Sequence, residues 1–146
     1  MTGTDPATLH RVFLGVASQT ITPDAGCQLS GFIARVEPMT GVHDELLVKA
    51  MVWAEDAALA NAAVLITFDL IELDRDEIGL IRDAVAAACG IPGDRVGITC
   101  THTHGGPATM TGRRLGNVAS GYLERVCRIV AETVETAARA LAPVFM

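Results

Sequence analysis

Two histidines stand two residues apart directly after an apolar segment of the chain. His102 and His104 follow the apolar run 96–100, and the sequence Gly-Gly-Pro at 105–107 follows them. Side chains in a strand alternate between its faces, so both imidazoles are expected to project from the same face. Two imidazoles that project together can hold a metal ion or transfer protons. The Gly-Gly-Pro sequence predicts a sharp turn that lets the backbone approach a ligand.

Zinc is the metal that this pair favours, because imidazole suits zinc best among the common hydrolytic metals. A catalytic zinc takes about three protein ligands, and the stretch around His102 and His104 supplies at most two of them. The alternative is that both histidines are loop residues that hydrogen-bond to backbone groups. Cys100 lies close enough to be a soft ligand, but a small core residue is the simpler interpretation.

Four other residues could reach the same site. Asp69 ends an apolar segment and could orient a histidine or bind a metal, or it could be an ordinary loop or helix-entry carboxylate. Arg35, His43 and Asp44 lie in a loop rich in glycine and proline, and each alone is typical of a surface or turn. The sequence has no GxSxG elbow and no Walker-type or dinucleotide-type glycine pattern.

Hydrophobic periodicity predicts the elements that position these residues. Asp74, with Glu77 three residues later, predicts a capping box at the start of the first helix. Gly90 and Pro92 predict the end of that helix. The predicted strands cover residues 12–17, 46–54, 62–70 and 95–101, with another starting at 142, and the predicted helices cover 74–89 and 120–141.

The order of these elements predicts an α/β fold, a mixed sheet with a βαβ unit and flanking helices. The short polar connection between 46–54 and 62–70 predicts a hairpin. Segment 62–70 is nearly all apolar, so we expect it to be buried on both faces. Ligands of parallel sheets collect at the carboxyl ends of the strands, so Asp69, His102 and His104 are expected at one edge.

Length and composition narrow the function classes. The 146 residues predict one domain, 1–146, and half of them are hydrophobic. A formal charge of −6 without a basic stripe argues against a nucleic-acid partner. No apolar run approaches a membrane span, and residues 1–10 lack the features of a signal peptide, so we expect a cytoplasmic location. The cysteines form no CxxC pair and are expected to be buried free thiols: Cys27, Cys89, Cys100 and Cys127.

Six short motifs occur in a characteristic order along the chain. They are LGVA at 14–17, ITP at 21–23, LSGF at 29–32, GVHD at 41–44, FDL at 68–70 and THTHGGP at 101–107. The ordered set resembles the N-terminal part of the neutral/alkaline (non-lysosomal) ceramidase family. The resemblance covers most of the chain, from about Phe13 to the second predicted helix.

The resemblance implies a zinc-dependent hydrolase of a small-molecule or lipid amide. Members of this family cleave the amide bond of ceramide to sphingosine and a fatty acid. By resemblance, His102 is a zinc ligand, and His104 is a catalytic residue beside the scissile amide. The remaining zinc ligands of the family, a histidine, a glutamate and a tyrosine, lie far downstream. We therefore expect this chain to be the N-terminal part of a larger catalytic domain, since it stops at 146 as a strand begins.

Two other functions remain open at this point. One is another metal-dependent hydrolase with a His-x-His strand end. The other is a catalytically inert α/β fragment that acts by association with a partner.

Overall fold

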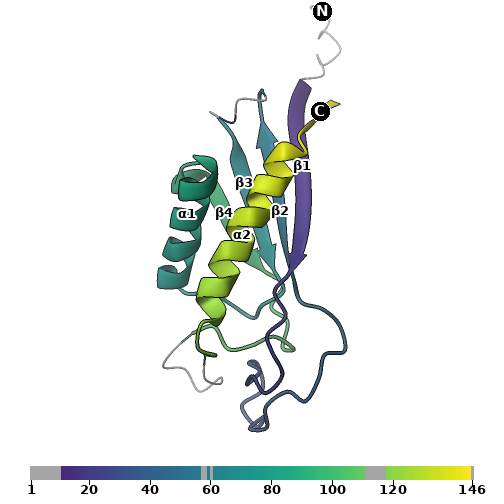
Figure 1. Ribbon diagram of the computed structural model, residues 1–146, viewed down its shortest axis with the longest axis vertical. Helices are drawn as coiled ribbons and strands as arrows, with labels where there is room; N and C mark the ends of the chain where they lie inside the picture. The colour runs from purple at the N-terminus through teal and green to yellow at the C-terminus, as the bar shows by residue number, and fades with distance from the viewer. Residues whose placement is uncertain (1–10, 57–58, 60, 111–117, 146) are drawn as a thin grey trace, which may run out of the picture.

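The computed structural model describes residues 11–56, 59, 61–110 and 118–145. Residues 1–10 and Met146 lie outside the described residues. The predictions about a leader and about the chain end depend partly on these residues. The described residues form one five-stranded sheet with two helices packed on one face (Figure 1). The strands are β1 Arg11–Thr20, β2 Leu47–Ala54, β3 Ala63–Phe68, β4 Val96–Cys100 and β5 Ala142–Phe145, and the helices are α1 Arg75–Cys89 and α2 Tyr122–Arg139, with a 3-10 turn η1 at Gly93–Arg95.

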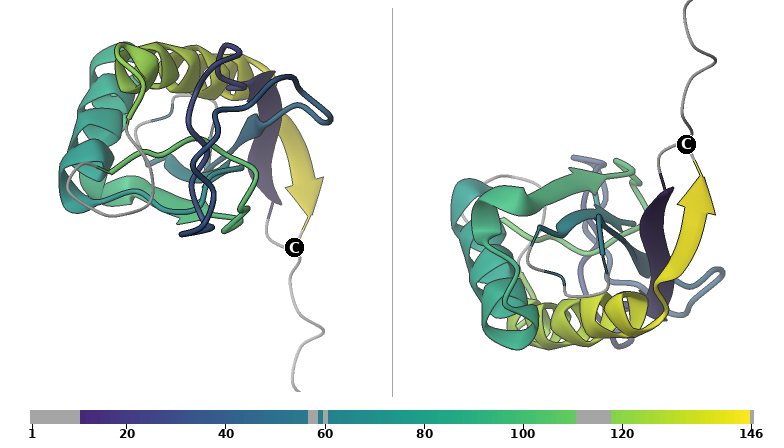
Figure 2. Two further views of the ribbon diagram at one scale, coloured as in Figure 1. Left: turned by 90° about the horizontal axis from the view of Figure 1, so that it is seen from below. Right: turned by 90° about the horizontal axis from the view of Figure 1, so that it is seen from above.

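The strand order across the sheet is β4-β3-β2-β1-β5. β3 and β4 run parallel with α1 as the crossover, and the other neighbouring strands are antiparallel. The predicted mixed α/β sheet, its βαβ unit and the β2–β3 hairpin are therefore confirmed. Viewed along the strands, both helices lie on the same side of the sheet (Figure 2).

Alternation along the strands explains the core. Every second residue of β2, from Val48 to Ala54, points towards the helices and is buried, while the residues between them are exposed. Ile81 and Val85 of α1 cover this face, together with the apolar side of α2. Gly15 of β1 lies directly beneath the backbone of α2, so this helix rests on β1 without an intervening side chain.

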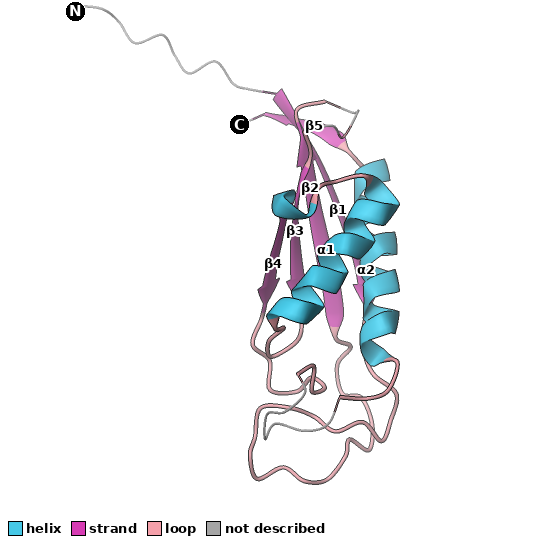
Figure 3. Ribbon diagram, turned by 90° about the vertical axis from the view of Figure 1, so that its left-hand side faces the viewer, coloured by secondary structure: helices cyan, strands magenta, loops and turns pink. Residues whose placement is uncertain are grey.

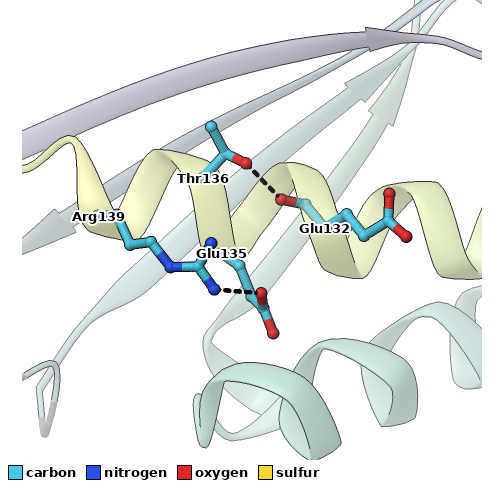
Figure 4. A network of polar contacts seen from close by, with 4 residues as sticks. All are labelled: Glu132, Glu135, Thr136 and Arg139. Carbon is cyan, nitrogen blue, oxygen red and sulfur yellow. Dashed lines mark hydrogen bonds and ion pairs between the residues drawn. The ribbon is translucent and has the colours of Figure 1, made fainter.

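The two helices are stabilised locally in different ways. In α1, the Asp74 carboxylate accepts a hydrogen bond from a backbone N–H, and Glu77 accepts one from the N–H of Asp74, so the capping box is confirmed. Gly90 ends this helix with a left-handed φ of 69°. Near the end of α2, Arg139 pairs with Glu135 one turn earlier at 2.6 Å (Figure 4).

The expectation that the third strand is buried on both faces is wrong. β3 alternates, and Leu65 on the face away from the helices is 38% exposed. Pairing places Leu65 beside Met51 and Met51 beside Val16, so this face carries a row of exposed apolar side chains. The reason is that both helices pack on the other face, which a continuous apolar run cannot indicate.

The connections that carry the candidate site gather at one end of the sheet, beyond the carboxyl ends of β3 and β4 (Figure 3). Among the described residues, no helix is both long enough and apolar enough to cross a bilayer.

Candidate functional site

The two histidines lie on a turn that begins where β4 ends. β4 stops at Cys100, but the next two N–H groups still donate to carbonyl oxygens at and after the end of β3: Thr101 to Phe68 at 2.9 Å and His102 to Leu70 at 3.0 Å. His102 then adopts a left-handed φ of 61°. Strand alternation therefore does not orient the two side chains, contrary to our expectation. The turn brings them together instead, with ring centroids 5.3 Å apart and planes at 65°.

The imidazole of His102 is oriented by a backbone carbonyl. Its Nδ1 lies 2.9 Å from the carbonyl oxygen of Ile71. A carbonyl oxygen can only accept, so in the neutral ring Nδ1 carries the hydrogen and Nε2 carries the lone pair. Histidines that bind metals commonly have this arrangement, with the second nitrogen fixed by a carbonyl or carboxylate. His102 is exposed, and its Nε2 is therefore suited to be one metal ligand.

His104 is half-buried against the loop that follows β1. Its ring meets the ring of Phe32 edge to face, with centroids 5.1 Å apart and planes at 77°. Within the described part of the chain, its ring nitrogens make no hydrogen bond, so both remain available for proton exchange with a bound molecule. The backbone around it is pinned, because Nη1 of Arg35 donates to the His104 carbonyl oxygen at 2.8 Å.

Backbone pairing holds this loop against the histidine turn. The N–H of Ser30 donates to the carbonyl oxygen of Gly106 at 2.8 Å, and Leu29 forms an antiparallel bridge with Pro107. Arg35 is 69 positions from His104 in the sequence, and the two are hydrogen-bonded. Of the loop residues proposed from the sequence, Arg35 thus contacts the site directly.

Asp69 lies at the expected edge of the sheet but is bonded to the backbone. Its Oδ2 accepts from the N–H of Leu47 at 3.0 Å, and its own N–H donates to the Leu47 carbonyl oxygen at 2.9 Å. Gly106 packs closely on the Asp69 carbonyl, since an added Cβ would lie 3.3 Å from that oxygen. These contacts favour the interpretation of Asp69 as a structural loop carboxylate.

His43 and Asp44 lie across a cavity from the histidine turn. The cavity has a volume of about 320 Å³ and is lined by both residues and, from the turn, by Thr103 and Gly105. His43 Nδ1 is 2.6 Å from Asp44 Oδ2, but the two side chains are 97% and 88% exposed. A contact between side chains that are so exposed contributes little to stability. The structure therefore places His43 and Asp44 near the turn but not beside the two imidazoles.

The described residues do not form a complete metal site. Across residues 11–56, 59, 61–110 and 118–145, no three His, Cys, Asp or Glu side chains are grouped so that they could hold a metal ion. Cys100 packs against the core, and burial, together with the charge of Glu72, raises the pKa of its thiol. A raised pKa disfavours the thiolate that binds metals. All four cysteines are free thiols as expected, although only Cys27 is buried and the other three are partly exposed.

Sequence reasoning missed Gly31 and Phe32 as site residues. Both belong to the LSGF motif at 29–32, which was noted only as part of the family resemblance. A glycine next to an aromatic residue in a loop gives no local signal of contact with a distant histidine.

Solved structures share this fold. The neutral ceramidase from Pseudomonas aeruginosa superposes with a TM-score of 0.78 at 20% identity, over 94% of this chain and 23% of the ceramidase. A ceramidase in complex with C2 superposes with a TM-score of 0.75 at 20% identity, over 90% of this chain and 22% of the other. No family model and no curated protein sequence matches the chain.

These superpositions confirm the α/β architecture. The chain spans less than a quarter of the length of either ceramidase. The prediction that it corresponds to the N-terminal part of such a protein stays a prediction, as do the zinc cofactor and the roles of His102 and His104.

Proposed function

We propose that this chain is part of a ceramidase-like hydrolase that acts on a lipid amide. The observation that carries the proposal is the pair His102 and His104 on the turn after β4. The two imidazoles lie 5.3 Å apart at the carboxyl edge of the parallel strands of a fold that ceramidases share. Nδ1 of His102 is already engaged by the Ile71 carbonyl, which leaves Nε2 for a metal.

The two histidines have different roles in this proposal. Nε2 of His102 is one zinc ligand, and further ligands come from outside the described residues. Zinc bound at such a site would polarise the amide carbonyl and lower the pKa of a bound water. The ring of His104 holds or moves a proton at the reacting amide, since its nitrogens are free of protein hydrogen bonds within the described residues.

The surroundings of His104 suit an apolar substituent of the amide. The loop beside it exposes three large apolar side chains: Phe32 is 56% exposed, Ile33 80% and Val36 72%. Phe32 touches the His104 ring itself. Apolar area of this kind stabilises an alkyl chain by about 25 cal/mol for each Å² that is removed from water.

Zinc titration of single variants tests the assignment of His102. In the 146-residue chain we expect weak zinc binding, because one or two imidazoles are fewer than the three or four ligands of a tight site. His102→Ala should abolish this binding. His43→Ala is the matched control, because His43 is also an exposed histidine at the same end of the sheet but does not belong to the His102–His104 pair. Equal zinc binding by His102→Ala and the unmodified chain contradicts the assignment.

Turnover of a short-chain ceramide analogue by the full-length protein tests the function. His102→Ala should lose both zinc and activity, whereas His104→Ala should keep much of the zinc and lose most of kcat. If the protein binds zinc and hydrolyses other amides but not the ceramide analogue, it is a different metal-dependent hydrolase. Absence of both zinc and turnover in the unmodified full-length protein refutes the proposal and favours an inert α/β fragment.

A further inference from the structure

Four residues of one loop surround His104, and we name them the His104 seat: Ser30, Gly31, Phe32 and Arg35. Ser30 is buried, with 2% exposure, and its N–H holds the turn through the Gly106 carbonyl. Gly31 and Phe32 contact the His104 side chain, and Arg35 binds the His104 backbone carbonyl. The seat is separate from His102, whose orientation comes from Ile71.

Gly31 leaves the space that the His104 side chain occupies. A Cβ at this position would lie 2.5 Å from Cγ, 2.7 Å from Cβ and 2.9 Å from Nδ1 of His104. Contacts under 3.0 Å are too short for real carbon atoms, so any larger residue must displace the imidazole or the loop. The φ of Gly31 is +103°, which also favours glycine. Position 31 is therefore restricted twice, once by its own backbone and once by the ring of His104.

Phe32 contacts the ring of His104, and Arg35 holds the backbone of this residue. The rings of Phe32 and His104 meet edge to face, and the Arg35 guanidinium lies 4.7 Å from the centroid of the Phe32 ring. Nη1 of Arg35 donates to both the Ser30 carbonyl oxygen at 3.2 Å and the His104 carbonyl oxygen at 2.8 Å. One guanidinium thus ties the loop, the Phe32 ring and the backbone of His104 together. A lysine ammonium could donate the hydrogen bonds, but it is a point charge without the planar group that lies over the Phe32 ring, so it cannot reproduce all three contacts.

We propose that Gly31 and Arg35 are positioning residues that set the direction of the His104 imidazole. Gly31 acts by leaving room for the ring, and Arg35 acts by holding the His104 backbone and the Phe32 ring. The consequence for catalysis rests on the proposed function, but the claim about ring position does not. Enzymes need such positioning because small displacements of a reacting group lower the rate steeply.

Nuclear magnetic resonance of the 146-residue chain tests the position of the ring without metal or substrate. The unmodified chain should show Overhauser cross-peaks from the Phe32 ring to the His104 ring. In Gly31→Ala these cross-peaks should weaken severalfold and the His104 ring resonances should shift. Gly26→Ala is the matched control, because Gly26 has a φ of +90° but nothing within 4 Å of an added Cβ. It carries the same backbone strain without the clash, and should leave the His104 signals unchanged.

Arg35→Lys keeps the test decisive if Gly31→Ala does not fold. It should shift the His104 and Phe32 ring signals, whereas Arg128→Lys, at an exposed position of α2, should not. Unchanged His104 signals in Gly31→Ala or Arg35→Lys overturn the proposal, and so do equal shifts in a variant and its control. In the full-length protein, Gly31→Ala should lower kcat with zinc content unchanged. Displaced ring signals with no turnover in the unmodified protein reject the proposed function but retain the positioning role.

Discussion

Replacing Gly15 by alanine should destabilise the protein far more than one methyl group suggests. A Cβ at Gly15 would lie 1.9 Å from the carbonyl oxygen of Ala137 and 3.1 Å from the backbone nitrogen of Leu141. The closest pair is about 1.5 Å short of an ordinary van der Waals contact. Both atoms belong to the backbone, in the last turn of α2 and just after it, so no side chain can rotate away to relieve the clash. The whole end of the helix must move from β1.

The cost follows from what α2 buries. Its apolar side, which includes Val126, Val130 and Val134, is fully buried against the sheet. Overpacking a core costs about 1–3 kcal/mol, and a clash with rigid backbone belongs at the upper end of that range. Removing a glycine stabilises by about 0.4–1 kcal/mol through the unfolded chain, which offsets part of the cost. We therefore expect a net loss of about 2 kcal/mol, which lowers Tm by roughly 4–8 °C in a domain of this size.

Urea denaturation followed by far-UV circular dichroism measures this loss. Gly97→Ala is the matched control, because Gly97 is also a strand glycine, yet an added Cβ there meets only ordinary contacts at 3.5 and 3.6 Å. It should change the free energy of unfolding by less than about 1 kcal/mol, in either direction. If Gly15→Ala is as stable as Gly97→Ala, the close packing of α2 on β1 is wrong.

Three further predictions concern titratable groups that are shielded from water. The hydroxyl of Tyr122 donates to the Ile21 carbonyl oxygen at 2.8 Å, so Tyr122→Phe should cost about 1–3 kcal/mol of unfolding free energy in the same urea assay. Burial raises the pKa of Tyr122, so above about pH 10 the tyrosine loses its proton only when the protein unfolds, and the free energy of unfolding should fall as pH rises there. The phenolate absorbance of this single tyrosine reports the loss of the proton. Ionisation of Tyr122 in the folded protein at about pH 10, the ordinary pKa of tyrosine, contradicts the burial. Burial likewise raises the pKa of all four cysteine thiols: Cys27, Cys89, Cys100 and Cys127. Iodoacetamide at pH 8 should therefore alkylate these thiols much more slowly in the native protein than in urea. Equal alkylation rates in the two conditions refute this prediction.

The sequence alone determined much of the local structure and pointed to the location of the candidate site. The capping box of Asp74 and Glu77 was predictable because both partners lie within one helical turn. The βαβ unit followed from element order, because parallel strands need a crossover. His102 and His104 were recognisable as a candidate pair because their short spacing keeps them close in space, although a turn and not strand alternation brings their rings together.

Tertiary structure decided the contacts between distant segments. The buried face of β3 depends on the side on which α1 and α2 pack, which a uniformly apolar run does not encode. Asp69 pairs with Leu47 rather than with a histidine because β2 and β3 meet in that register. Gly31 touches the His104 ring only because backbone pairing draws the loop onto the turn. Local propensity and periodicity depend on neighbours in the sequence, whereas these contacts depend on how complete elements are placed in space.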